Sequence, residues 1–195
     1  MFTGLIQDVG KVRAIDRAGD WRIEIATSFD MGDVALGASI ACSGVCLTVT
    51  EKESGWFAVE ASAETLSKTT VGDWDEGRPL NLERSLKLGD ELGGHLVFGH
   101  VDGIAEITAR APDGDSTRFR ISPPPELAKF IAPKGCVSVD GVSLTVNEVE
   151  GDEFGVNIIP HTLANTGFGK TQVGDRVNLE IDMLARYVAR LLPES

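Results

Sequence analysis

Two segments of the chain place small hydrogen-bonding side chains at alternate positions of an apolar run. In Cys46-Leu47-Thr48-Val49, strand alternation would put Cys46 and Thr48 on one face and the apolar residues on the other. Ser143-Leu144-Thr145-Val146 has the same pattern. Either segment alone is typical of a strand that faces solvent. Because the pattern recurs, a polar pocket floor that binds a heterocycle with several donors and acceptors is favoured.

Histidines form a second group of candidate residues. His95 and His100 lie in the segment 95–103, and a strand there would turn them to opposite faces. One metal ion would not easily bind both, so His95 is interpreted as a structural, hydrogen-bonded residue and His100 as a candidate for binding or proton transfer. Gly99 would let a ligand approach the backbone closely.

Two loops are further candidates for binding. Ser62-Ala63-Glu64-Thr65 and Ile159-Pro160-His161-Thr162 occupy matching places after matching strands. A plain turn is the alternative interpretation of both loops.

These candidates recur because the chain repeats itself with an offset of 97 residues. Of the 47 positions from 37 to 83, 17 are identical to their counterparts in 134–180, where chance would give about three. Upstream, the offset falls to 96 and then 95. A period this long indicates a duplicated domain rather than a solenoid. We expect a first domain at 1–95, a second at 96–182 and a terminal helix at 183–195.

Each copy is predicted to be all-β. Polar and apolar residues alternate in 22–26, 117–121 and 175–181, and Gly, Asp and Pro separate such runs. About 90 residues of short strands fit a small closed barrel. Short helices are expected at 124–131 and as single turns at 64–67 and 161–164.

The last segment departs from the repeat. Asp182 can cap a helix whose apolar residues form one stripe. This stripe either packs on the chain's own barrel or joins copies of the chain in an oligomer.

Composition excludes several classes of function. The 195 residues carry 18 Lys+Arg against 30 Asp+Glu, a net charge of −12, and no basic cluster stands out for nucleic acid. No apolar run is long enough for a membrane helix. There is no P-loop, no GxGxxG after a strand and no zinc-type cysteine spacing among the three cysteines. With no leader-like start, the chain is expected to be cytoplasmic.

Several segments together resemble the riboflavin synthase family, which is built from two lumazine-binding domains. They are the opening Met1-Phe2-Thr3-Gly4, the runs 44–50, 93–103 and 140–146, and Ile159-Pro160-His161-Thr162-Leu163. The resemblance implies two tandem six-stranded Greek-key barrels and a C-terminal helix that assembles a homotrimer. It also implies the dismutation of two molecules of 6,7-dimethyl-8-ribityllumazine, without an external cofactor or metal, at a site shared by neighbouring chains. Lumazine synthase is a candidate protein partner.

The resemblance also implies site residues. His100, Ser39 and Cys46 match positions linked to catalysis. In the first barrel, the implied substrate contacts are Gly4, Leu5, Ile6, Cys46, Leu47, Thr48, Glu60, Ala61, Ser62, Ala63, Glu64 and Thr65. In the second barrel, they are Gly99, His100, Val101, Lys134, Ser143, Leu144, Thr145, Ile159, Pro160, His161, Thr162, Leu163 and Ala164.

Two residues depart from the family pattern. Phe98 stands where a small residue such as Ser is frequent, and its bulk would narrow the second pocket. Ser43 stands where Asn is common. The rival interpretations are a lumazine or flavin carrier without turnover and a structural barrel pair without a ligand. The pocket residues kept in the second copy favour the enzyme.

Overall fold

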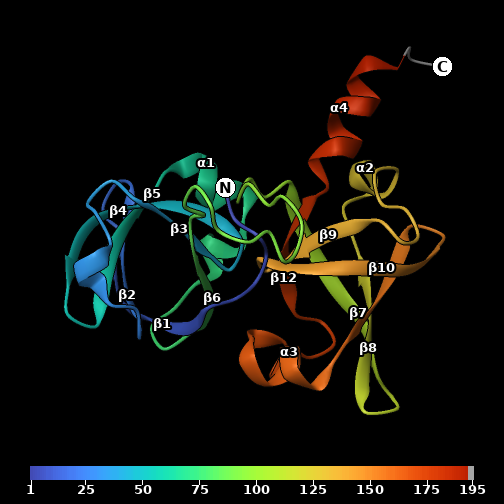
Figure 1. Ribbon diagram of the computed structural model, residues 1–195, viewed down its shortest axis with the longest axis horizontal. Coiled ribbons are helices and arrows are strands. Elements are labelled where there is room, and N and C mark those ends of the chain that lie inside the picture. Colours follow the sequence, from blue (N-terminus) through green and yellow to red (C-terminus); the bar gives the residue numbers. More distant parts are fainter. Residues whose placement is uncertain (193–195) are drawn as a thin grey trace.

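Each half of the repeat closes into a six-stranded antiparallel barrel, and the two barrels lie side by side (Figure 1). The computed structural model describes residues 1–192. The strand order around the first barrel is β1-β2-β5-β4-β3-β6, and the second barrel repeats this cyclic order with β7 to β12. The prediction of two tandem all-β barrels is therefore confirmed.

The first barrel consists of one hairpin, a three-stranded antiparallel meander and one further strand. The strands are β1 (Asp8–Asp16), β2 (Trp21–Ala26), β3 (Ser39–Cys42), β4 (Val45–Glu53), β5 (Trp56–Ala61) and β6 (Pro79–Arg84). A short helix α1 (Ala63–Lys68) follows β5, and 3-10 turns occupy Met31–Asp33 and Thr70–Asp73.

The second barrel has corresponding elements. Its strands are β7 (Gly103–Asp113), β8 (Ser116–Ser122), β9 (Cys136–Val139), β10 (Val142–Glu150), β11 (Glu153–Ile158) and β12 (Arg176–Ile181). Helix α2 (Pro125–Ala128) is one turn, shorter than the 124–131 that the sequence predicted. Helix α3 (Pro160–Asn165) and a 3-10 turn at Gly167–Gly169 follow β11.

Strand alternation fills each barrel with apolar side chains. Along β4, Val45, Leu47 and Val49 are buried, whereas the intervening residues reach the outer face. β10 alternates in the same way. In the second core, the rings of Phe119 and Phe168 meet edge to face, with centroids 5.5 Å apart. The outward-facing pattern predicted for both polar segments is confirmed.

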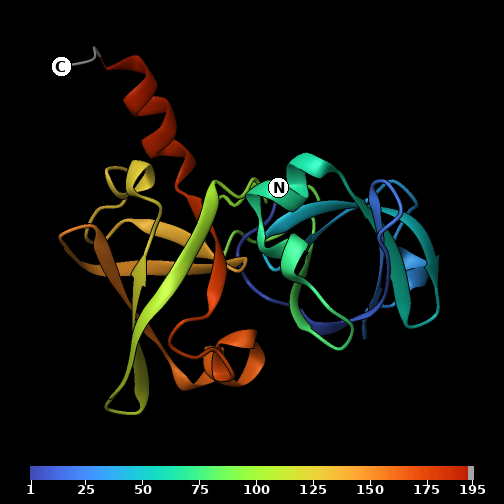
Figure 2. The ribbon, with the colours of Figure 1, turned by 180° about the vertical axis from the view of Figure 1, so that it is seen from behind.

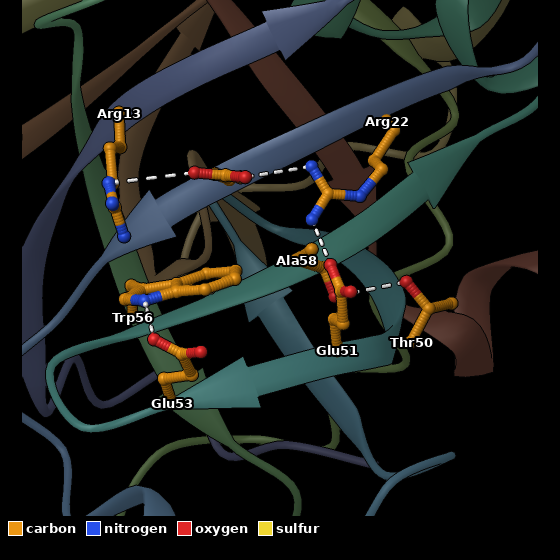
Figure 3. A network of polar contacts seen from close by, with 8 residues as sticks. Arg13, Arg22, Thr50, Glu51, Glu53, Trp56 and Ala58 are labelled. Carbon is orange, nitrogen blue, oxygen red and sulfur yellow. Dashed lines mark hydrogen bonds and ion pairs between the residues drawn. The ribbon is translucent and has the colours of Figure 1, made fainter.

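The outer face of the first barrel carries an ionic network across neighbouring strands (Figure 3). Arg22 on β2 pairs with Glu24 and also reaches across β5 to Glu51 on β4. The repeat conserves the second contact, because Arg118 pairs with Glu148 at 2.6 Å. Such exposed pairs add only about 0–1 kcal/mol each, so burial in the two cores dominates stability.

The segment between the barrels corrects one prediction. Residues 95–103 do not form a strand before β7 begins at Gly103; only Val97 makes a β-bridge, to Phe2. The segment contains two glycines, and the backbone bonds of residues 95–97 go to Phe2 and Thr3 near the N-terminus instead of to a neighbouring barrel strand. The argument that strand alternation separates His95 from His100 therefore does not apply.

Two asparagines that are 97 residues apart join the barrels. Asn81 on β6 donates to the carbonyl of Asp140 at 2.9 Å and accepts from Gly167 N at 2.7 Å. Asn178 on β12 donates to the carbonyl of Ser43 at 2.8 Å and accepts from Thr70 N at 2.7 Å. These two asparagines thus make reciprocal contacts between the duplicated domains.

Glycines allow a close approach of the barrels at Gly44 and Gly141. Gly44 and Gly141 both have φ of +81°, and a Cβ on Gly44 would lie 2.7 Å from Gly141 N. A side chain at either position would push the barrels apart.

Asp140 is predicted to make this junction sensitive to pH. Burial raises the pKa of its carboxyl from 3.8 to about 7. The carboxyl of the unfolded chain ionises near pH 4, whereas that of the folded chain stays protonated until about pH 7. The free energy of unfolding therefore falls as pH rises from about 4 to 7. Asp140→Asn keeps the acceptor for Asn178 N and tolerates the φ of +45°. We expect it to stabilise the protein by up to about 4 kcal/mol at pH 8, roughly 1.4 kcal/mol for each pKa unit of the shift, and little at pH 4.

Urea unfolding at both pH values measures this effect. Asp152→Asn, a change at an exposed turn carboxyl, is the control and should be neutral at both. Equal effects of Asp140→Asn at pH 4 and pH 8 would contradict the assignment.

Helix α4 (Met183–Leu191) extends away from both barrels, as the front and back views agree (Figure 2). Asp182 caps it through a bond from Leu184 N at 2.9 Å, as predicted. From Leu184 onward its large apolar side chains are exposed, with Tyr187 at 60% and Leu191 at 84%, whereas Met183 at its base is half-buried. Packing of this stripe on the chain's own barrel is therefore wrong. Residues 193–195 of the predicted helix lie outside the described residues.

Candidate active site

The outer face of β3 and β4 carries three of the predicted residues. Cys46 is partly buried and Thr48 is exposed, and both point out of the barrel. Ser39 on β3 is the register partner of Thr48 and therefore lies on the same face. Leu47 points into the core and is 3% exposed, so it offers this face its backbone only.

Two arms exchange between the barrels beside these strands. The first arm is residues 1–6 and the second arm is residues 96–101; they cross at a bridge between Phe2 and Val97. The carbonyl of Gly99 accepts from Cys46 N at 2.9 Å, and Val101 packs against the first core. The second arm, with His100, thus lies against the first barrel.

The first arm makes the reciprocal contact. The carbonyl of Gly4 accepts from Ser143 N at 2.8 Å, and Ile6 packs against the second core. The sequence had grouped Gly4, Leu5 and Ile6 with the first barrel and Gly99, His100 and Val101 with the second. The structure reverses both groupings, because each arm adds its backbone to the edge of the opposite barrel.

The outer face of β9 and β10 forms the second composite surface. Ser143 is partly buried, Thr145 is exposed, and Leu144 points inward. His95 Nδ1 lies 2.7 Å from Ser143 Oγ, which confirms His95 as a hydrogen-bonded residue. Burial lowers the pKa of His95 and favours its neutral form.

Lys134 lies at the start of this surface in an unusual backbone conformation. Its φ is +68°, and its amide donates to the carbonyl of Val146 at 2.8 Å. The equivalent residue in the first barrel is Gly37, with φ of +81° and the matching bond to Val49. Lys134 is therefore held in a glycine-type backbone conformation next to β10, and the residue is exposed.

The two predicted loops end β5 and β11 and begin short helices. Glu60 and Ala61 are the last residues of β5, Ser62 caps α1, and Glu64 and Thr65 lie in its first turns. Ile159 precedes α3, which contains Pro160, His161, Thr162, Leu163 and Ala164. Side chains 62–64 and 159–161 are exposed, whereas Ala61 is fully buried.

His100 borders a cavity of about 260 Å³ at the base of α4. Glu180, Met183, Arg186 and Tyr187 also line it. The Phe98 ring is tilted against the His100 ring, with centroids 5.8 Å apart. Phe98 therefore lies beside His100 and the base of α4.

Cys136 is a residue that the sequence analysis passed over. It is the register partner of Thr145 and occupies the place that Ser39 has in the first barrel. Burial raises the pKa of its thiol, with a further contribution from Asp182. The offset of 97 already relates Cys136 to Ser39, so the repeat was the signal that could have found it.

Within residues 1–192, no cluster of His, Cys, Asp and Glu could hold a metal ion. Over the same residues, no helix is both long and apolar enough to cross a membrane.

Comparison with known proteins identifies the family. The lumazine binding domain model matches twice, at residues 3–85 and 98–182. A riboflavin synthase from Brucella abortus is 56% identical over 98% of this chain and 98% of its own length. The chain belongs to the riboflavin synthase family. A synthase from Bacillus subtilis is 39% identical over 98% of this chain and 90% of its own.

A solved structure agrees with the fold of this chain. LumP complexed with riboflavin superposes with a TM-score of 0.86 over 93% of this chain and 100% of that one, at 24% identity. The prediction of a riboflavin synthase, a transferase that makes riboflavin from dimethylribityllumazine, is confirmed by the close relatives.

Proposed function

We propose that the two composite surfaces are the sites of two 6,7-dimethyl-8-ribityllumazine molecules. The first site contains Cys46, Leu47 and Thr48, the second arm and the loop 60–65. The second site contains Ser143, Leu144 and Thr145, the first arm, Lys134 and the loop 159–164. The observation that carries this proposal is the reciprocal exchange of arms, because it builds two similar polar surfaces from one repeat.

The two proposed sites differ where proton transfer would be needed. His100 on the second arm has Leu5 as its counterpart on the first arm. Only the first site therefore has an imidazole on its arm, a group suited to moving protons near neutral pH. We propose that His100 removes the proton from the acidic 7-methyl group of one lumazine.

In the proposed reaction, one lumazine donates a four-carbon unit to the other. The products are riboflavin and 5-amino-6-ribitylaminouracil, so the carbon atoms balance without another reactant. A nucleophile adds to C7 of one lumazine, and water, a ribityl hydroxyl, Ser39 and Cys46 are the candidates. Holding both molecules together can contribute roughly 7–11 kcal/mol toward the barrier of a bimolecular step.

We further propose that the reacting sites belong to neighbouring chains of a homotrimer. The exposed apolar stripe of α4 supports this, because such a stripe is stable when a second copy covers it. We also propose that the chain divides into a first domain at 1–95, a second at 96–182 and a terminal helix at 183–195.

The three free thiols fit a cytoplasmic enzyme. Lumazine synthase stays a candidate partner.

Incubation with 6,7-dimethyl-8-ribityllumazine alone tests the function. We expect riboflavin absorbance to grow, with one riboflavin and one pyrimidine formed for every two lumazines consumed. Tight lumazine binding without any riboflavin would instead indicate a carrier.

A further inference from the structure

Two buried glutamates occupy equivalent places near the ends of the last barrel strands. Glu83 on β6 is 2% exposed and Glu180 on β12 is 4% exposed, and they are 97 residues apart. Neither makes an ion pair within residues 1–192. Burial raises the pKa of both carboxyls. A buried carboxyl needs hydrogen-bond partners, and here they come from the arms.

Glu83 holds the first arm with three hydrogen bonds. Its Oε1 accepts from the amide and the hydroxyl of Thr3, both at 2.7 Å, and its Oε2 accepts from Gly4 N at 2.9 Å. Thr3 and Glu83 are both buried, so water does not compete easily for these bonds.

Glu180 holds the second arm at the equivalent place. Its Oε1 accepts from Phe98 N at 2.7 Å, and Phe98 has the place of Thr3 in the offset of 95. Gly99 then has φ of +73°, compared with +75° for Gly4, so the arms leave the glutamates in the same conformation. Glu180 Oε2 is buried without a hydrogen-bond partner within the described residues, and Glu180 lines the cavity that His100 borders.

Beyond the glutamate, each arm meets the opposite barrel at close range. A Cβ on Gly4 would lie 2.5 Å from Ser143 Cβ, and a Cβ on Gly99 would lie 2.6 Å from Cys46 Cβ. The arm carbonyls accept from these same two residues. Small shifts at the glutamates must therefore move the arm relative to a strand of the other barrel.

We propose that Glu83 and Glu180 are positioning residues, each of which sets the ligand site on the opposite barrel by holding its own barrel's arm. Glu83 on the first barrel positions Gly4 to Ile6 against Ser143. Glu180 on the second barrel positions Gly99 to Val101 against Cys46. This inference rests on the proposed sites, but the crossed arrangement of the arms can be tested without a ligand.

Amide hydrogen exchange tests the arms directly in the full chain. Glu83→Gln places an amide donor against the arm's own donors, and we expect exchange at Ser143 N–H to rise about tenfold while Cys46 N–H is unchanged. Glu180→Ala should give the reverse pattern. Thr3→Val, which removes one bond and keeps Glu83, should give a smaller rise at Ser143.

The matched control is Ser138→Ala on β9. Ser138 pairs in register with Glu180 and is 1% exposed, and its hydroxyl has no hydrogen-bond partner within the described residues. We expect neither reporter amide to change. Loss of protection in both barrels alike, or in the glutamate's own barrel, would overturn the proposal.

Binding of 6,7-dimethyl-8-ribityllumazine then tests the effect on the sites. Thr48→Arg is designed to block the first site and Thr145→Arg the second, because both threonines point outward and are exposed. Added to Thr48→Arg, Glu83→Gln should raise Kd at least about tenfold; added to Thr145→Arg, it should leave Kd within about twofold. Glu180→Ala should do the opposite.

Each binding result decides something. Crossed exchange with unchanged Kd values would overturn the positioning role and leave the enzymatic function intact. If neither Thr48→Arg nor Thr145→Arg protein binds lumazine, the proposed sites are refuted. The exchange pattern alone would then decide whether each glutamate holds its arm against the opposite barrel.

Discussion

Truncation after Asp182 is expected to dissociate the assembly and to reduce riboflavin formation at least about a hundredfold, because the proposed site needs barrels from two chains. The truncation removes α4, whose apolar stripe is exposed in the single chain. Sedimentation velocity and the riboflavin assay at the same protein concentration measure both effects.

A milder variant separates assembly from local damage. The Arg186 guanidinium donates a hydrogen bond to the Asp102 carboxylate at 2.5 Å, and Asp102 lies two residues after His100. Truncation therefore also disturbs the chain beside His100. Leu191→Glu changes only the distal, exposed stripe and should lower assembly and activity together. Arg190→Ala is the matched control on the same turn. Full activity of a dilute monomer would refute the intersubunit site.

His100→Gln is expected to lower kcat by about 10² to 10⁴ while Kd for the lumazine changes only a few-fold, as for loss of a proton-transfer group. Glutamine keeps hydrogen-bonding capacity but cannot exchange a proton near neutral pH.

His100→Ala and Phe98→Ser provide the comparison. The alanine variant should match the glutamine variant if proton transfer is the role of His100. Phe98→Ser removes the ring beside His100 and keeps its backbone bond to Glu180, so a smaller loss is expected. An unchanged kcat in His100→Gln would remove His100 from the mechanism.

The sequence was sufficient for the barrels because each copy carries its own local pattern. The offset of 97 located both barrels, and strand alternation placed Cys46, Thr48, Ser143 and Thr145 on outer faces. These properties depend on neighbouring residues in the chain. Asp182 was also recognisable as a helix cap from local sequence alone.

The exchange of arms had no such local signature. The bonds from Cys46 to Gly99 and from Ser143 to Gly4 join residues 53 and 139 positions apart, and glycine offers no side-chain pattern to pair. The sequence thus assigned each arm to the barrel that follows it in the chain. The contact of Gly99, the residue before His100, with Cys46 became visible only in three dimensions.

The central claim is that two lumazines react across barrels of different chains. Mixing Thr48→Arg with Thr145→Arg protein, after joint unfolding and refolding, tests it most directly. Each variant alone should be inactive. In mixed assemblies, about one interface in four should join the intact first barrel of a Thr145→Arg chain to the intact second barrel of a Thr48→Arg chain, and activity should return there. A mixture as inactive as its components, despite proven subunit exchange, would contradict the claim.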